Sequence, residues 1–324
     1  MSAPDRRDGD RRGTRVRGSV VPEAEFRSYY GRPILKPPVW TWEVPWYFFA
    51  GGLAGASASL GLGARLAGNH PLARNAFTAA GAAGTVAVPL LASDLGRPER
   101  FLYMLRMFKV TSPLSVGSWI LATMAPAAVG AAASDRLGVL PRLGRAAEVA
   151  AGLLGPALAT YTGTLVADTA VPAWHEAGRE LPFVFAGSAA ASAGAAAVLS
   201  TPAADAGPAR RLVVAGALLE LGAAGAMERR LGELGEPYRQ GPAGRLARAA
   251  KACTAAGAGL VAAAGRRRAL AAAGAALVLA GSACERWAVY KAGFQSAADP
   301  KYVVGPQRAR LAARQAEQDD PVEP

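Results

Sequence analysis

The chain has few side chains that could hold a redox centre. Its 324 residues include two cysteines, Cys253 and Cys284, and two histidines, His70 and His175. An iron–sulfur cluster takes about four thiolates, so the sequence excludes one, and we expect both cysteines to be small apolar packing residues. A membrane b-type haem needs paired histidines at matching depth. The two histidines fall in loops on opposite faces of the membrane, which excludes a haem-carrying cytochrome b. No P-loop, dinucleotide fingerprint or metal-ligand cluster is present in the sequence either.

Aromatic residues are also scarce, at 7% of the chain, although 52% of its residues are hydrophobic. The apolar content is therefore mainly Ala, Leu, Val and Gly. The mean hydropathy is +0.17 although 19% of the residues are charged, so charge and hydrophobicity are segregated along the chain. A large soluble helical protein is the alternative, but its helices need a polar stripe. Runs such as "AAVGAAA" and "AASAGAAAVL" have none. Long apolar runs bounded by charges predict membrane-spanning helices.

Eight spans can be drawn, and they define an all-α membrane protein. They cover 45–64, 75–93, 114–134, 146–167, 182–200, 212–228, 249–265 and 269–284. The seventh crosses only if Arg248 and Lys251 extend towards the interface; otherwise the count is seven. Small residues in these spans favour close helix packing in lipid.

The basic residues predict the topology. Residues 1–20 are polar and Arg-rich without an apolar core, so we expect no cleaved signal peptide and interpret 1–28 as a disordered cationic tail. With eight spans, 26 of the 36 Lys and Arg fall on the side of the amino terminus. The positive-inside rule then predicts a multi-pass protein of the inner or plasma membrane with both termini cytoplasmic. The net charge of +12 therefore reflects topology and gives no support to nucleic-acid binding.

Polar residues at membrane depth are the candidates for function. Glu220 lies near the middle of the sixth span, where a carboxylate is costly unless it is paired, neutral or near water. It is either a functional acid or a protonated group that packs helices together. Tyr161 lies in the fourth span, where its hydroxyl could donate to a quinone carbonyl; the alternative is an interface aromatic. Glu43 stands in the aromatic cluster "PPVWTWEVPWYFF", and Asp94 and Asp168 stand at span ends.

The connection between the second and third spans is unusually specific. It reads "SDLGRPERFLYMLRMFKVTSPLSVGSW" over 93–119, and Phe101, Leu102, Leu105 and Phe108 recur in it at helical spacing. This pattern predicts a short amphipathic helix in the plane of the interface, within 94–113. We expect its cations to face headgroups or a docked partner; they are Arg97, Arg100 and Arg106.

At these residues the chain resembles the NrfD/PsrC family, the membrane subunits of polysulfide-reductase-like molybdenum oxidoreductase complexes. The resemblance rests on "WTWEVPWYFFAGGLAGAS", on "DLGRPERFLYMLRMFKVTSPLSVGSW", on "YTG" at 161–163 and on "KAGFQSAADPKY". It implies eight helices in two four-helix bundles, no cofactor within this chain, and a quinone pocket in the first bundle. Tyr161 matches the quinone-contacting tyrosine of the family, with Glu43 and Asp94 as polar neighbours of the pocket. The first span has no histidine to match the one that contacts quinone in some members.

The resemblance also implies partners and a function. The partners are a ferredoxin-like iron–sulfur subunit and a molybdopterin catalytic subunit, and the substrate is a quinone such as menaquinone. We divide the chain into a lead-in over 1–38, a first bundle over 39–168, a second bundle over 169–291 and a polar tail over 292–324. The expected function is quinone-linked electron exchange, with Glu220 and Asp168 as candidate proton relays. The alternatives are a proton- or ion-coupled carrier and a purely structural anchor.

Overall fold

The computed structural model describes residues 33–319, and this part of the chain is helical and contains no β-strand. The predicted basic tail over 1–28 lies outside these residues. Within them, eight helices have 20 residues or more: α1 (Glu43–Leu66), α2 (His70–Ser93), α3 (Pro113–Leu137), α4 (Pro141–Ala167), α6 (Leu181–Ser200), α7 (Gly207–Leu231), α9 (Gly241–Ala263) and α10 (Arg268–Ala298). The shorter elements are η1 (Pro98–Leu105), α5 (Pro172–Glu176), η2 (Gly232–Gly235), α8 (Glu236–Arg239) and α11 (Lys301–Asp319).

Five of the described helices are long and apolar enough to cross a membrane, namely α2, α3, α4, α6 and α10. This confirms the prediction of an all-α, multi-pass membrane protein. The other three long helices, α1, α7 and α9, do not meet this criterion of length and apolar composition. In α9, for example, Arg245, Arg248 and Lys251 all lie within the first half of the helix. The count of eight spans therefore stays a prediction.

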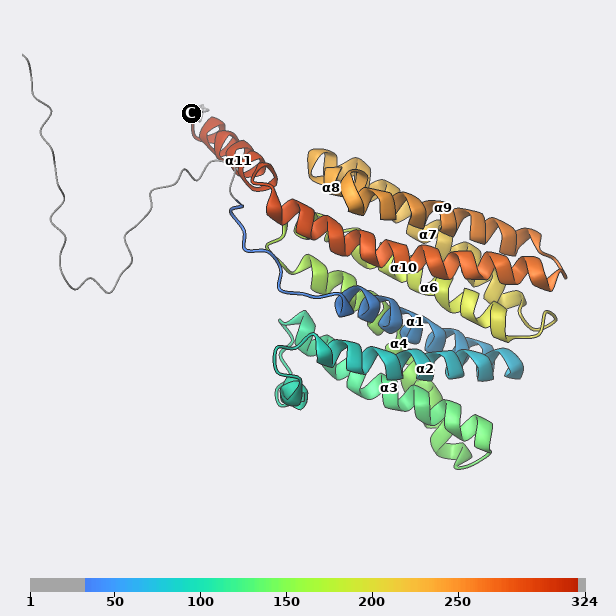
Figure 1. Cartoon of the computed structure of the whole chain (residues 1–324). Coiled ribbons are helices and arrows are strands. Elements are labelled where there is room, and N and C mark those ends of the chain that lie inside the picture. The colour runs from blue at the N-terminus through green and yellow to red at the C-terminus, as the bar shows by residue number, and fades with distance from the viewer. Residues whose placement is uncertain (1–32, 320–324) are drawn as a thin grey trace, which may run out of the picture.

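The long helices lie side by side and alternate in direction (Figure 1). Helices α1 to α4 pack on one another, as do α6, α7, α9 and α10, and the two groups meet where α1 contacts α6 and α10 and where α4 contacts α6. Short turns join the helices at one end of the molecule. The longer connections, with η1, α5 and α8, lie at the other end together with α11 (Figure 1).

Local sequence signals set the helix ends. Proline occupies one of the first two positions of α2, α3, α4, α6, α7 and α9, where its missing N–H costs nothing. The Asn69 side chain caps α2 by accepting from the Leu72 N–H at 3.1 Å. Gly138 ends α3 with a φ of 68°, a conformation that favours glycine.

Paired glycines allow the closest helix contacts. Gly55 of α1 faces Gly155 of α4, and Gly187 of α6 faces Gly216 of α7. A Cβ atom at any of these positions would overlap the backbone of the facing helix. The backbones therefore approach closely, as small residues permit in membrane helices.

Four elements differ from the sequence prediction, and the first is α9, which begins at Gly241 and not at residue 249. The last long helix, α10, continues to Ala298 instead of ending at residue 284, and α11 makes the expected polar tail helical over Lys301–Asp319. The interface helix is the 3₁₀ helix η1, which ends before Phe108. With three residues per turn, its inward side chains are Phe101 and Met104, while Leu102 is 68% exposed.

Candidate functional site

Tyr161 lies at an open cleft between α3 and α4. The cleft has a volume of about 640 Å³ and is also lined by Val116 and Ile120 of α3. The Tyr161 side chain packs against Gly117, where a Cβ atom would overlap the ring. Its hydroxyl oxygen is buried and has no hydrogen-bond partner among the described residues. A buried hydroxyl without a partner costs free energy, so this hydroxyl is unsatisfied among the described residues.

Asp168 belongs to the same cleft. It follows Tyr161 by seven residues, at the end of α4, and lines the cleft together with Thr164 and with His175 of α5. Asp168, Thr164 and His175 are exposed. The His175 ring nitrogen Nδ1 lies 3.2 Å from the Ala167 carbonyl oxygen. The exposed Asp168 and His175 can therefore exchange protons with water at the mouth of the cleft, while the Tyr161 phenol is buried.

Glu43 and Asp94 meet at a different place, where α1 begins and α2 ends. Thr41 joins them: its backbone N–H donates to Asp94 Oδ1 at 3.0 Å, and its hydroxyl lies 2.9 Å from the same oxygen. The hydroxyl also contacts the Glu43 carboxylate. A hydroxyl has one proton to donate, so only one carboxylate can receive it at a time. Neither acid lines the Tyr161 cleft, and their place beside a quinone stays a prediction.

A second buried hydroxyl lies on α1. Tyr47 is 2% exposed, and its hydroxyl oxygen has no partner in the described part of the chain. The sequence analysis missed Tyr47 because it stands in an aromatic cluster typical of an interface belt. No local sequence signal separates Tyr47 from its aromatic neighbours, because its burial depends on packing between helices.

Glu220 is buried among α7, α9 and α10. It is 2% exposed, and Thr254 of α9 donates to its Oε1 at 3.4 Å, whereas Oε2 has no partner among the described residues. Glu220 and Glu285 of α10 line one cavity of about 30 Å³, which is room for about two water molecules. Lys251 and Glu228 line the same cavity and form an ion pair at 2.6 Å. The Lys251 side chain is 39% exposed, and its expected extension towards the interface stays a prediction.

The charged pair beside this cavity was not predicted. Arg286 is 1% exposed, and its Nη1 lies 2.5 Å from Glu285 Oε2. Its Nη2 donates to the Phe185 carbonyl oxygen at 3.0 Å, and its guanidinium lies 3.9 Å from the centre of the Phe185 ring. The predicted span ended at 284, so Arg286 was counted among the 26 cations on the side of the amino terminus. It lies instead within α10, so it does not count as a cytoplasmic cation.

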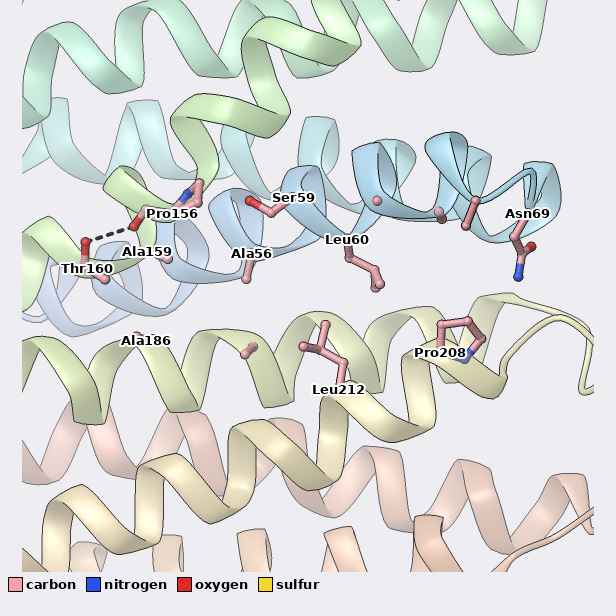
Figure 2. Close-up of a pocket in the computed structure, with 14 residues that line it drawn as sticks. Ala56, Ser59, Leu60, Asn69, Pro156, Ala159, Thr160, Ala186, Pro208 and Leu212 are labelled. Carbon is pink, nitrogen blue, oxygen red and sulfur yellow. Dashed lines mark hydrogen bonds between the residues drawn. The ribbon is translucent and has the colours of Figure 1, made fainter.

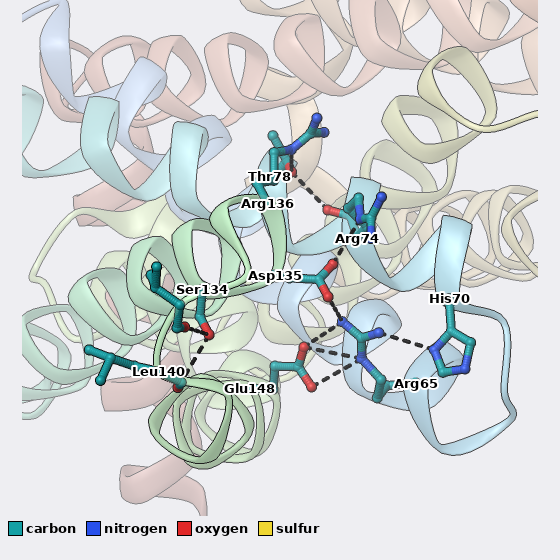
Figure 3. Close-up of polar contacts among 10 residues, drawn as sticks. Arg65, His70, Arg74, Thr78, Ser134, Asp135, Arg136, Leu140 and Glu148 are labelled. Atoms are coloured by element: carbon teal, nitrogen blue, oxygen red, sulfur yellow. Dashed lines mark hydrogen bonds and ion pairs between the residues drawn. The ribbon is translucent and has the colours of Figure 1, made fainter.

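At the end of α1–α4 that lies opposite η1, an ion-pair cluster connects the four helices (Figure 3). Arg65 Nη2 lies 2.6 Å from Glu148 Oε1 and 3.0 Å from Asp135 Oδ1, and Arg65 Nη1 lies 3.1 Å from the His70 ring. Arg74 Nε adds a contact of 3.1 Å to Asp135. These side chains come from all four helices, so the cluster fixes their relative positions at this end.

The three predicted docking arginines are exposed at η1. Arg97 and Arg106 flank this helix and Arg100 lies within it. Arg106 lies 5.3 Å from the centre of the Tyr103 ring. The segment after η1 is attached to α3, because Ser115 and Trp119 both donate to the Met107 carbonyl oxygen, at 3.1 and 3.4 Å. The arginines are therefore carried on an anchored segment.

The fold and these polar sites define a multi-pass helical membrane protein. The sequence model of the family described as polysulphide reductase, NrfD, matches residues 35–227. The chain belongs to this family. The matched range includes the Tyr161 cleft, the Glu43–Asp94 contact, η1 and Glu220, and it ends before α9 and α10. A comparison with curated proteins gives no match.

Proposed function

We propose that the chain is the quinone-binding membrane subunit of an oxidoreductase complex. It exchanges electrons between a quinone pool, with menaquinone as the expected quinone, and a ferredoxin-like iron–sulfur subunit. That subunit is linked in turn to a molybdopterin catalytic subunit. The observation that carries the proposal is the buried, unpartnered Tyr161 hydroxyl at an open cleft within the family match.

The cleft has the groups that quinone chemistry requires. Reduction of a quinone to a quinol takes up two electrons and two protons. Tyr161 offers a hydrogen-bond donor to a carbonyl oxygen, while the apolar side chains Val116 and Ile120 line the cleft beside it. Asp168 stands exposed at the mouth, so it can pass protons between water and the cleft. The chain itself is proposed to carry neither haem nor an iron–sulfur cluster.

The partner is proposed to dock at the end of the molecule that carries η1. Arg97, Arg100 and Arg106 are exposed there, and η1 and its flanks also expose Leu102, Tyr103 and Met107. Cations around an apolar patch suit a partner with an acidic rim. This is the same end at which α4 finishes (Figure 1), and Val110 and Thr111, which follow η1, line the Tyr161 cleft, so docking here keeps the electron path short.

The proposed topology has eight crossings in two four-helix bundles, α1–α4 and α6, α7, α9 and α10. The basic residues place the η1 end and both termini in the cytoplasm, in an inner or plasma membrane. The lateral contacts within each group of four helices support this division.

The test is Tyr161→Phe, which removes one hydroxyl and little volume. Because the hydroxyl has no partner among residues 33–319, the variant should fold normally. The affinity for quinone should fall by about 2- to 13-fold, equal to about 0.5–1.5 kcal/mol. The measurement is quinol-linked electron transfer in membranes that contain the complete complex, with rates normalised to assembled protein.

Tyr238→Phe is the matched control. The Tyr238 hydroxyl is also buried, but it donates to the Ala173 carbonyl oxygen at 3.0 Å. Its loss should lower the free energy of unfolding by about 1–3 kcal/mol and leave the quinone affinity unchanged. An unchanged affinity in Tyr161→Phe would contradict the quinone site, and a preparation of the complex without bound quinone would favour a purely structural anchor.

A second function, proton conduction, is favoured by a separate observation. Glu220 and Glu285 share a cavity large enough for water, with one Glu220 oxygen unpartnered. We propose that Glu220 relays protons within the second group of helices. Asp168 serves the first group, and the two acids line different cavities.

A further inference from the structure

An apolar crevice separates the two groups of helices. It lies between α1 and α4 on one side and α6 and α7 on the other, and its volume is about 510 Å³. Figure 2 shows Leu60 of α1 opposite Leu212 of α7, with Ala186 of α6 across from Ala159 of α4. These walls belong to helices of a membrane protein, so the crevice is in contact with lipid and not with bulk water.

The polar groups in the walls are already used within the protein. The Ser59 hydroxyl donates to the Gly152 carbonyl oxygen at 3.1 Å, and the Thr160 hydroxyl donates to the Pro156 carbonyl oxygen at 2.8 Å. At the far end, the Asn69 amide donates to the Asp205 carbonyl oxygen at 2.8 Å. The hydroxyl protons of Ser59 and Thr160 are therefore taken, and the rest of the walls is predominantly apolar. Such walls favour a hydrocarbon chain as the occupant.

The length of the crevice matches one leaflet. It runs beside α1 from Ala56 to Ala67, and a rise of 1.5 Å per residue makes this about 17 Å. Half of a bilayer core is about 15 Å thick. The crevice ends at the turn that holds Asn69 (Figure 2), at the end of the molecule opposite η1. A chain lying in it would start at the headgroup level beside Asn69 and end near the bilayer centre.

A cation, Arg211, lies near the end of the crevice that holds Asn69. Pro208 lines the crevice at the start of α7, and Arg211 follows one turn later, exposed and next to Leu212. The Arg211 guanidinium lies back towards the first residue of α7, where a Cβ atom at Gly207 would be 3.8 Å from its Nη1. An anionic phosphate at this position would meet Arg211 and the positive end of the α7 dipole.

We propose that this crevice binds one phospholipid, with an acyl chain between the two groups of helices and the phosphate beside Arg211. The lipid fills the seam that direct helix contacts leave open. This inference depends on the membrane location of the helices and not on the quinone site.

The test is native mass spectrometry of the full chain, equilibrated in vesicles of equal phosphatidylglycerol and phosphatidylcholine and then extracted in mild detergent. The wild-type chain should retain one phospholipid. Ala190→Phe places a ring in the crevice and should lower this retention at least tenfold, and Ala186→Leu, a smaller change, should lower it too. Ala255→Phe is the control, since Ala255 is exposed on α9, which does not line the crevice; it should retain the lipid.

The headgroup contact is tested by Arg211→Gln. One cation near the membrane surface is worth about 1 kcal/mol, or about fivefold, so the preference for phosphatidylglycerol over phosphatidylcholine should fall about fivefold. Full retention by both filled variants would overturn the proposal, as would equal loss in Ala255→Phe. Retention of a quinone in place of a phospholipid would also overturn it.

Discussion

Glu220 is the residue whose environment departs most from what a membrane helix favours. It is buried with one carboxylate oxygen unpartnered, while the nearby Glu285 is paired with Arg286. A buried acid without a full set of partners is destabilising. A structural role would be served better by an amide or an apolar side chain of the same shape. The arrangement therefore favours an acid that gains and loses a proton.

Glu220→Gln separates these roles, because it keeps the shape of the side chain but cannot ionise. We expect turnover of the assembled complex to fall about 10²-fold or more, as for loss of a proton-transfer group, with the quinone affinity unchanged. Glu233→Gln, on an exposed glutamate of η2, should behave as wild type. Lower yield with normal activity per assembled complex would instead show that Glu220 only packs helices together.

At the scale of elements, the connection between α2 and α3 is the most specific. Asp94 holds its beginning through Thr41, and Ser115 and Trp119 hold its end through the Met107 carbonyl. A connecting loop needs neither attachment. The attachments keep the cations of η1 exposed in a fixed place, as a docking surface requires.

Reversal of two of these charges should detach the partner. In Arg97→Glu/Arg100→Glu we expect the affinity for the iron–sulfur subunit to fall about tenfold, at roughly 0.7 kcal/mol for each reversed charge. The chain should still insert, since both side chains are exposed. Co-purification at low salt is the measurement. Arg266→Glu/Arg267→Glu, exposed at the opposite end, is the control, and equal partner loss in both double variants would argue against docking at η1.

The same elements show how far the sequence alone reaches. Apolar runs predict most of the long helices to within about five residues, because burial in lipid selects uniform composition. The predicted start of α9 is eight residues late. Apolar runs do not predict the end of α10. Glu285 and Arg286 resemble the charged end of a span, although each charge is compensated inside the protein. At η1, the assumed period of 3.6 predicts Phe101 correctly, but it misses Met104 and places the exposed Leu102 and Phe108 on the inward face. The sequence alone identifies Tyr161 and Glu220 as candidates, but Tyr47 and the cavity at Glu285 depend on packing between distant helices.

At the scale of the whole molecule, an even or odd number of membrane crossings determines the side of the membrane on which the carboxyl end lies. Helix α9 is the test case, because three cations stand in its first half. Its 23 residues span about 34 Å, enough for a bilayer core of about 30 Å, and Lys251 is neutralised by Glu228. If α9 crosses, both termini lie on one side; if it does not, the seven remaining crossings place them on opposite sides.

Labelling of single cysteines with a membrane-impermeant maleimide distinguishes these topologies. The single cysteines are introduced into a chain in which Cys253 and Cys284 are replaced by alanine. We expect Arg266→Cys and Leu137→Cys, exposed at the end opposite η1, to react in intact cells. Arg100→Cys, Gln240→Cys and Gly305→Cys are exposed at the η1 end and should react only after permeabilisation. The pair Leu137→Cys and Arg100→Cys, at the two ends of α1–α4, calibrates the assay independently of α9. Labelling of Gly305→Cys in intact cells, with Arg100→Cys still protected, would place the carboxyl end outside and reduce the count to seven.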